Sequence, residues 1–280
     1  MALTTQQLDE RRNFIGSSDA AAIFGMDPFK SAHDVYLSKV MEVGQIEDNE
    51  AIDIGNRVES VLLQWAEEKI GRPLQRNVLV RKGIFGANLD AEVVGANEIV
   101  EAKSTGLSDE WGEPGTDQVP DRVIIQTHHA MYVKGAVIAW VPVLIGRFGL
   151  KLEMYRVERN EDVIEAVAKN GELFWNRHVL PRVPPSDSKP SLELLKRIRR
   201  EPGKVVPIDA ELVRAYLEAR DAAKVAIELE EMKKAELIAA LGDADAGQCE
   251  DGRVTYLEQS RKEHVVKAST FRVLRWKGIK

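Results

Sequence analysis

The 280-residue chain has little cysteine and no long apolar run, and both absences exclude classes of protein. Its single cysteine, Cys249, excludes an intrachain disulfide framework and any zinc or iron–sulfur site built from cysteines alone. No uninterrupted apolar stretch is long enough to span a bilayer, and the N-terminus has no apolar signal-peptide core. We therefore expect a cytoplasmic location and no membrane partner.

An excess of positive charge is also missing, because the formal net charge is −6. A globally basic nucleic-acid binder is excluded, so any grip on DNA must come from local patches such as Arg11-Arg12 or Lys196–Arg200. The rest of the composition is ordinary: 44% of residues are hydrophobic and 30% are charged, which is typical of a folded protein with a substantial core.

The most informative pattern in the chain is D-x10-E-x-K, formed by Asp90, Glu101 and Lys103. An apolar run leads into Glu101, so residues 99–103 are predicted to end a buried strand. Side chains alternate along a strand, so Glu101 and Lys103 would project from one face of the sheet. Asp90 would reach that face from a neighbouring strand, across a turn at residues 95–97.

Two carboxylates and an ammonium group on one sheet face are unfavourable unless something binds there. Carboxylate oxygens suit Mg²⁺, and Lys103 would orient a water molecule beside the ion. The plain alternative is an edge hairpin whose charged side chains all face water. The pattern by itself does not decide between the two, so the other parts of the chain must supply matching pieces.

Two further polar residues are candidates for the same site. Glu59 lies at the margin of the buried stripe of a predicted helix over residues 51–70, where it would add a third carboxylate or simply be solvated. Gln126, at the start of a helical segment, would hold a lysine or a metal-bound water, or lie at the surface. His128 and His129 point about 100° apart on a helix, so we interpret them as surface or packing residues rather than metal ligands.

A candidate anion site lies nearer the N-terminus, where Arg11, Arg12, Ser17 and Ser18 precede a predicted helix start. Backbone N–H groups at a helix N-terminus, a hydroxyl and a guanidinium together suit a phosphate group. The alternative is an ordinary helix cap by Ser18 or Asp19. Asp19 also argues against an anion there, unless its carboxylate faces elsewhere.

The order of the predicted elements indicates an α/β fold with a mixed sheet and helices on its faces. Helices come first, then two or three strands over 76–103 and a long loop over 104–121. A helix over 123–133, a strand pair over 136–157 and a closing helix over 161–177 complete this part.

Prolines after residue 180 indicate a linker. We predict a core domain over 1–185, a linker over 186–207 and an extension over 208–280. The extension would contain one long helix or a helical hairpin over 209–241, a polar turn over 242–252 and a terminal β-hairpin that pairs 254–257 with 265–266.

Four blocks of residues occur in the order and spacing of YqaJ-type viral recombinases. They are Ile-Gly-Ser-Ser-Asp-Ala-Ala-Ala at 15–22, Gly-Asn-Arg-Val-Glu at 55–59, the Asp90…Glu101-Ala102-Lys103 pattern, and Gln126 with Met131 and Gly135. Over about residues 10–180 the chain resembles this family of phage exonucleases, which are similar to lambda exonuclease and belong to the PD-(D/E)xK nuclease superfamily. The resemblance implies a restriction-endonuclease-like core, a mixed sheet flanked by helices.

The resemblance also implies roles for the residues. Asp90, Glu101 and the backbone carbonyl of Ala102 would bind Mg²⁺, which Mn²⁺ should be able to replace, and Lys103 would assist the attacking water. Glu59 matches the family's helix glutamate and possible further metal ligand, and Gln126 matches the glutamine near the site. A terminal 5′-phosphate would be held by the residues at the helix start: Ser18, Ser17, Arg11 and Arg12.

The implied activity is 5′→3′ hydrolysis of double-stranded DNA from its ends, leaving 3′ single-stranded overhangs for a single-strand annealing protein. Family members form toroidal homotrimers and act in phage or prophage recombination in a bacterial host. Two departures touch no metal ligand: Ala130 stands where a tyrosine is frequent, and Leu89 precedes Asp90 where a proline is frequent. The alternatives are an endonuclease or repair nuclease of the same superfamily, and a non-catalytic DNA-binding or assembly protein.

Overall fold

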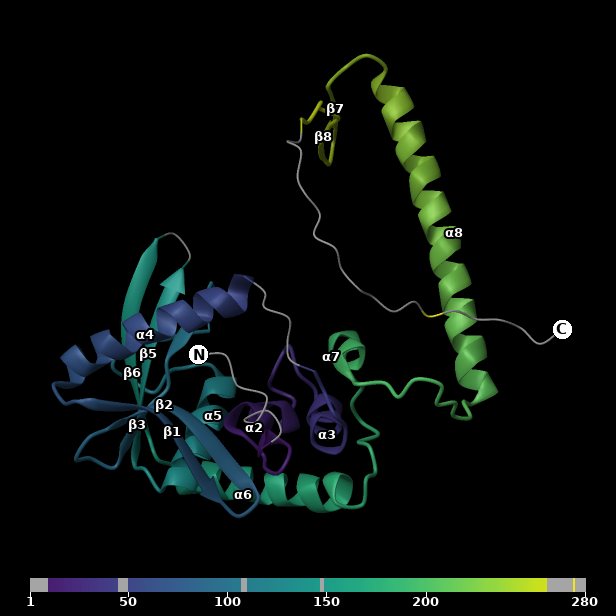
Figure 1. Cartoon of the computed structure of the whole chain (residues 1–280). Coiled ribbons are helices and arrows are strands. Elements are labelled where there is room, and N and C mark those ends of the chain that lie inside the picture. The colour runs from purple at the N-terminus through teal and green to yellow at the C-terminus, as the bar shows by residue number, and fades with distance from the viewer. Residues whose placement is uncertain (1–9, 45–49, 107–109, 147–148, 261–273, 275–280) are drawn as a thin grey trace. The chain divides into compact units, whose positions relative to one another are not determined.

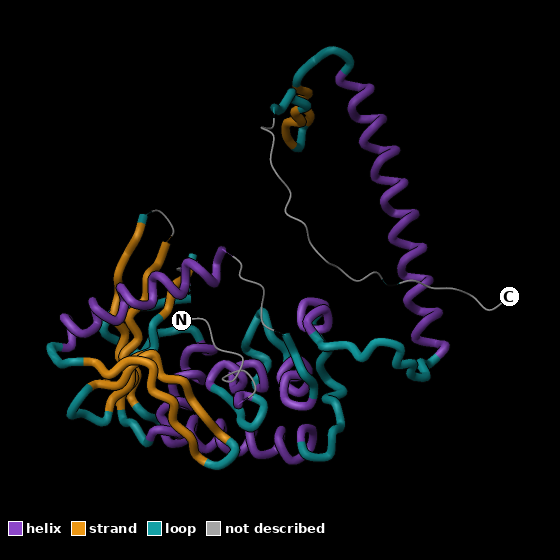
Figure 2. Tube along the Cα trace, in the orientation of Figure 1, coloured by secondary structure: helices purple, strands orange, loops and turns teal. Residues whose placement is uncertain are grey.

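The computed structural model describes residues 10–44, 50–106, 110–146, 149–260 and 274 (Figure 1). The chain divides into two compact units, Met1–Arg200 and Glu201–Lys280. The first unit is a mixed sheet flanked by helices, so the predicted α/β core is confirmed (Figure 2). Among the described residues, none of the helices combines the length and the apolar character needed to cross a membrane.

The helices predicted over 51–70, 123–133 and 161–177 are present close to these limits as α4, α5 and α6, whereas α7 lies within the predicted linker. Capping residues explain several ends: Ser31 Oγ accepts from Asp34 N at 3.0 Å at the start of α3, and Gly135 ends α5 in a left-handed conformation with φ 80°. The helices are α2 (Ser17–Ile23), α3 (Ala32–Val40), α4 (Glu50–Ile70), α5 (Asp121–Lys134), α6 (Glu161–Phe174), which continues into a π-helical turn to Val179, and α7 (Leu192–Arg197).

The sheet runs in the order β1-β2-β3-β5, with β6 on the far side of β5. The β1–β2, β2–β3 and β5–β6 pairs are antiparallel, whereas β3 and β4 both pair with β5 in parallel. Because β6 occupies one edge of β5 along its length, β3 and β4 are two pieces of one interrupted strand on the other edge. The strands are β1 (Leu74–Lys82), β2 (Phe85–Val93), β3 (Glu98–Val100), β4 (Lys103–Thr105), β5 (Ile138–Gly146) and β6 (Leu150–Glu158).

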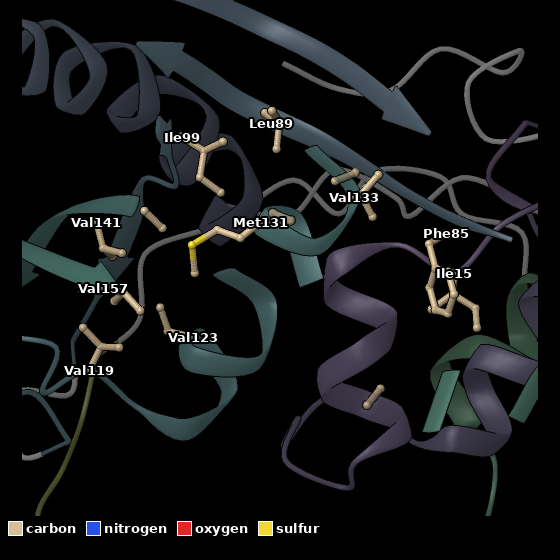
Figure 3. Packing of buried hydrophobic residues seen from close by; sticks show 14 of the residues in the cluster. Ile15, Phe85, Leu89, Ile99, Val119, Val123, Met131, Val133, Val141 and Val157 are labelled. Atoms are coloured by element: carbon tan, nitrogen blue, oxygen red, sulfur yellow. The ribbon is translucent and has the colours of Figure 1, made fainter. Parts of the chain in front are cut away.

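Two apolar cores lie against the sheet. In the larger one, Met131 of α5 is fully buried beside Ile99 and Val141 (Figure 3). In the smaller one, Leu63 and Ala66 of α4 pack against the sheet residues Ala91, Val93 and Val100. The sheet is therefore held between α5 and α4, whose side chains reach the site described below.

Residues beyond the predicted core still belong to the first unit. Leu194 and Ile198 are buried, and Ile198 forms an antiparallel bridge with Val43. Gly44 N also donates to Arg197 O at 2.9 Å. The compact unit thus reaches Arg200. The predicted domain limits (1–185, 186–207 and 208–280) concern which parts of the chain fold independently, and they remain a prediction.

The second unit contains one long helix, α8 (Ala210–Leu241), rather than a helical hairpin. The prediction of a polar turn over 242–252 is wrong for Ala246–Cys249, because these residues form β7 and pair with β8 (Gly252–Thr255). An exposed two-stranded hairpin needs no apolar alternation, so its first strand carried no signal. The predicted partner strand at 265–266 lies outside the described residues.

Candidate active site

The three residues of the D-x10-E-x-K pattern meet where the sheet is interrupted. Glu101 and Ala102 fill the gap between β3 and β4, and Glu101 N donates to Trp140 O at 2.9 Å. From β2, Asp90 Oδ2 accepts a hydrogen bond from Ala102 N at 2.8 Å. The prediction that Asp90 reaches this point from a neighbouring strand is confirmed, although the strand pauses at Glu101 instead of continuing to Lys103.

Lys103 holds this group together. Its Nζ donates to Glu101 Oε1 at 2.7 Å and to Gln126 Oε1 of α5 at 2.7 Å. The Lys103 and Glu101 side chains are 24% and 14% exposed, so the pair is largely shielded yet open to a ligand from one side. Glu101 and Lys103 therefore share a face as predicted, and Gln126 is brought to the lysine.

The carboxylates at this site destabilise one another's charge. Burial first, and the Glu101 carboxylate next, raise the pKa of Asp90, while Lys103 and the Ala102 amide act in the opposite direction. Glu59 of α4 also raises the pKa of Asp90, so its carboxylate acts on the same site. Glu59 is partly buried, as its predicted position at the margin of the helix stripe requires. A bound cation would relieve this repulsion.

The donor set suits a hard cation with few protein ligands. Among the described residues, no three His, Cys, Asp or Glu side chains form a group that could hold a metal ion. Asp90 and Glu101 are two carboxylates, and a backbone carbonyl would be a third oxygen. Mg²⁺ uses one or two carboxylates and keeps several waters, so the residues fit this ion and fit a fully caged metal poorly.

The two histidines of α5 are packing residues. His129 is buried and its Nε2 lies 3.1 Å from Gly86 O. Burial lowers the pKa of His129 to about 4, so the ring is neutral at pH 7. His128 Nδ1 lies 2.8 Å from Ile124 O, and Asn160 N donates to its Nε2 at 3.2 Å. These contacts agree with the interpretation of His128 and His129 as packing residues rather than metal ligands.

The helix start near the N-terminus is arranged differently from the prediction. Gly16 is the N-cap of α2, rather than Ser18 or Asp19. Asp19 lies in the first turn, and its Oδ2 accepts from Gly16 N at 2.9 Å. A glycine cap followed by an acidic third residue satisfies the free N–H of the cap, so the helix begins before both of the predicted cap residues.

Asp19 faces inward, where two lysines neutralise it. Lys39 Nζ of α3 lies 2.6 Å from Asp19 Oδ2, and Lys30 pairs with the other carboxylate oxygen. Burial disfavours the charge on Asp19, yet Lys30, Lys39 and Arg11 together hold its pKa well below the usual range. Asp19 therefore does not repel an anion at the serines, and this removes the objection that the sequence raised.

Arg11, Ser17 and Ser18 gather around the same helix start. The Arg11 Nη2 lies against Gly16, and Lys39 Nζ donates to Arg11 O at 2.8 Å. Ser17 Oγ is buried and has no hydrogen-bond partner within the part of the chain that the structure describes. Ser18 and Arg12 are both partly exposed.

Helix α5 connects the two groups of candidate residues. Its Gln126 contacts Lys103, and one turn later lies His129, whose pKa is lowered by burial and raised in part by the Asp19 carboxylate. Ala20 and Ala21 of α2 pack with α5 in a small apolar cluster. Sequence reasoning missed Lys30 and Lys39; the signal for Lys39 was its helical spacing, one turn after buried Val35.

Residues 7–137 match the YqaJ-like viral recombinase domain. This region is similar to a YqaJ-like viral recombinase domain. It includes every candidate residue named from the sequence, from Arg11 to Gln126. The family resemblance expected from the four sequence blocks is therefore confirmed as a resemblance over residues 7–137.

A curated relative has the same family name. The chain is 31% identical over 182 residues to the uncharacterized protein YqaJ of Bacillus subtilis (strain 168), an alignment that covers 62% of this chain and 56% of the relative. The chain thus spans little more than half the length of the curated relative that it matches.

Two solved structures are similar in fold to this chain. One is LHK-Exo in complex with dAMP, with a TM-score of 0.51, 16% identity and coverage of 62% of this chain and 92% of that chain. The other is the alkaline exonuclease LHK-Exo from Laribacter hongkongensis, with a TM-score of 0.50, 16% identity and the same coverage. At this level of identity the likeness extends to the fold, which is the mixed α/β core predicted from the sequence.

Proposed function

We propose that this chain is a metal-dependent 5′→3′ exonuclease that hydrolyses double-stranded DNA from its ends and leaves 3′ overhangs. The observation that carries the proposal is the convergence of Asp90, Glu101 and Lys103 at the break between β3 and β4. The similarity of residues 7–137 to a YqaJ-like viral recombinase domain and the likeness in fold to an alkaline exonuclease support the proposal.

The cation in this proposal is Mg²⁺, with Mn²⁺ able to replace it. Asp90, Glu101 and the Ala102 carbonyl would hold the ion, and Glu59 would act from α4 as a further ligand or through a water. When bound, Mg²⁺ polarises the scissile phosphate and neutralises negative charge that repels DNA. Glu101 and Asp90 keep their positions without the ion, through the Lys103 ammonium and the Ala102 amide respectively.

In this proposal Lys103 positions the attacking water by a hydrogen bond. An ammonium group has three N–H donors, and Glu101 and Gln126 each accept one at 2.7 Å. The third donor is left for the attacking water or a phosphate oxygen. The amide oxygen of Gln126 accepts one of the other two hydrogen bonds from the ammonium group. This contact with α5 orients the ammonium group and so sets the direction of the third donor.

The helix start at α2 would bind the terminal 5′-phosphate. Arg11 would supply a guanidinium group, and Ser18 and Ser17 would supply hydroxyl groups. Arg12, the next residue after Arg11, would supply a second guanidinium group. The buried Ser17 hydroxyl without a partner is the group that such a phosphate would satisfy. LHK-Exo binds dAMP in its crystal structure, and a deoxynucleoside monophosphate is the product that stepwise hydrolysis from an end would release here.

We further propose that the chain forms a homotrimeric ring in the cytoplasm of a bacterial host and delivers its overhangs to a single-strand annealing protein. A ring retains DNA by enclosing it, which agrees with a net charge of −6 and the lack of a strongly basic surface composition. Sedimentation equilibrium tests the assembly: a species of three chain masses supports it, and a monomer at all concentrations contradicts it.

The test of the proposed function compares linear duplexes with 5′-phosphate and 5′-hydroxyl ends in Mg²⁺. We expect the native chain to prefer phosphorylated ends and Ser18→Ala to reduce that preference about 10- to 100-fold, the loss of a hydrogen bond to a charged group. Ser38→Ala is the matched control, because its hydroxyl donates to Val35 O within α3. Cutting of closed circular DNA would instead support the endonuclease alternative.

A further inference from the structure

Asn77 of β1 has an unusual backbone conformation. Its φ is 57°, and of the non-glycine residues that the structure describes only Arg182 shares a positive φ. L-residues rarely adopt this left-handed region, and asparagine tolerates it better than most. In the middle of a strand such a residue rotates the backbone, so Asn77 marks a local change in the sheet.

The strand pairing shows what that change is. On one side of Asn77, Arg76 pairs with Ala91, and on the other side Val78 pairs with Leu89. The register is the same on both sides, and Asn77 stands opposite Asp90 without joining the ladder. No residue has been inserted, so the two strands rotate together about this unpaired position instead of forming a bulge.

The side chains confirm the rotation. Val78 and Val80 of β1, with Leu89 of β2, contribute to the larger core. Leu74 of β1, with Ala91 and Val93 of β2, contributes to the smaller core. Alternation along regular strands would place all of these residues on one face. The faces of the β1–β2 ladder therefore change over at Asn77 and Asp90.

Asp90 lies at the centre of this change, and its carboxylate meets the break between β3 and β4. There Oδ2 accepts from Ala102 N at 2.8 Å. We propose that the left-handed backbone of Asn77 is a positioning device for Asp90, which turns the aspartate out of the regular pleat and toward Ala102. This inference deepens the proposed function, since Asp90 is a cation ligand there, but its structural part applies to the metal-free protein.

The proposal separates backbone conformation from side-chain chemistry at Asn77. The Asn77 side chain is exposed, so its removal alone should leave the site intact. Asn77→Gly keeps the left-handed conformation without strain, whereas Asn77→Val favours an extended backbone. Gln75→Val is the matched control, because Gln75 is also exposed on β1 but pairs regularly with Glu92.

The first measurement is hydrogen exchange of the Ala102 amide by NMR, in the full chain with EDTA. We expect Asn77→Val to speed this exchange by about 10-fold or more relative to amides of β5, and Asn77→Gly and Gln75→Val to match the native chain. The second is Mn²⁺ binding by calorimetry without DNA. We expect Asn77→Val to weaken it about 10- to 100-fold, as loss of a group that orients a ligand does.

Equal Ala102 exchange in Asn77→Val and Asn77→Gly would overturn the proposal, as would a uniform rise at all amides, which shows general destabilisation only. If Asn77→Val does not fold, Asn77→Ala, which strains the same conformation without a branched side chain, decides by the same comparison. Failure of the native chain to bind Mn²⁺ would count against the proposed function, while the exchange result would still decide the role of Asn77.

Discussion

At the scale of single residues, the candidate active site places the Asp90 carboxylate where burial and neighbouring carboxylates disfavour its negative charge. The carboxylates of Glu101 and Glu59 both act on Asp90, and Lys103 is the counter-charge hydrogen-bonded to Glu101. Such a combination opposes folding, because burial of carboxylates that repel one another disfavours their charge. A cation bound as proposed would relieve this repulsion.

This arrangement predicts how stability depends on pH. Burial and Glu101 raise the pKa of Asp90 to about 8 in the metal-free fold. A carboxyl group with a higher pKa in the folded state binds more protons when folded, so stability falls as pH rises from about 4, the unfolded value, to about 8. We expect Asp90→Asn to stabilise the metal-free protein at pH 8, by on the order of 2 kcal/mol.

Thermal melting in EDTA measures this difference. The gain from Asp90→Asn should disappear at pH 4, where the native carboxyl is protonated, and exposed Glu165→Gln should show no comparable change. The Asn77 variants are the second test at this scale, since they address how the backbone directs Asp90. A variant Asp90→Asn that melts below the native chain at pH 8 would contradict the electrostatic account.

At the scale of elements, most helices and strands follow from local signals. Helical spacing of apolar residues predicted α4 and α6, and Gly135 predicted the end of α5. The turn at 95–97 joins β2 to β3 as expected, which brings Asp90 beside Ala102. These features depend on neighbours in the sequence, so a single sequence carries them.

What the sequence did not predict depends on contacts between distant segments. The interruption at Glu101 and Ala102 lies between two segments that both pair with β5, a strand about 40 residues later in the chain. Asn77 is left-handed because the β1–β2 ladder must serve two cores, and Asp19 turns inward because α3 supplies Lys39. No periodicity or motif records such tertiary relations.

Helix α7 provides a test at this scale, because it lies after the prolines yet packs on the first unit. Leu194 is 5% exposed and Leu192 is 75% exposed. We expect Leu194→Ala to destabilise the first unit by about 2–4 kcal/mol, as truncation of a buried leucine does. Leu192→Ala, its control, should stay within about 0.5 kcal/mol. Equal effects in chemical denaturation would mean that α7 is a peripheral linker and that the core ends near residue 185.

At the scale of the whole molecule, the candidate site lies in the first unit, and the described residues of the second unit include none that is buried. Every candidate residue lies in Met1–Arg200, whereas α8 of the second unit contains no buried residue. We expect the substitutions that abolish activity to lie in the first unit. Assembly and partner binding are assigned to neither unit.

The most direct test of the account is digestion of linear duplex DNA labelled at either end, with Mg²⁺ or EDTA, by the native chain and by Lys103→Ala. Lys103 contacts both Glu101 and Gln126, so its removal should abolish activity without removing a carboxylate. The account predicts Mg²⁺-dependent shortening from the 5′ ends that falls by at least about 100-fold in Lys103→Ala. Absence of digestion by the native chain with any divalent cation, or full activity of the variant, would contradict it.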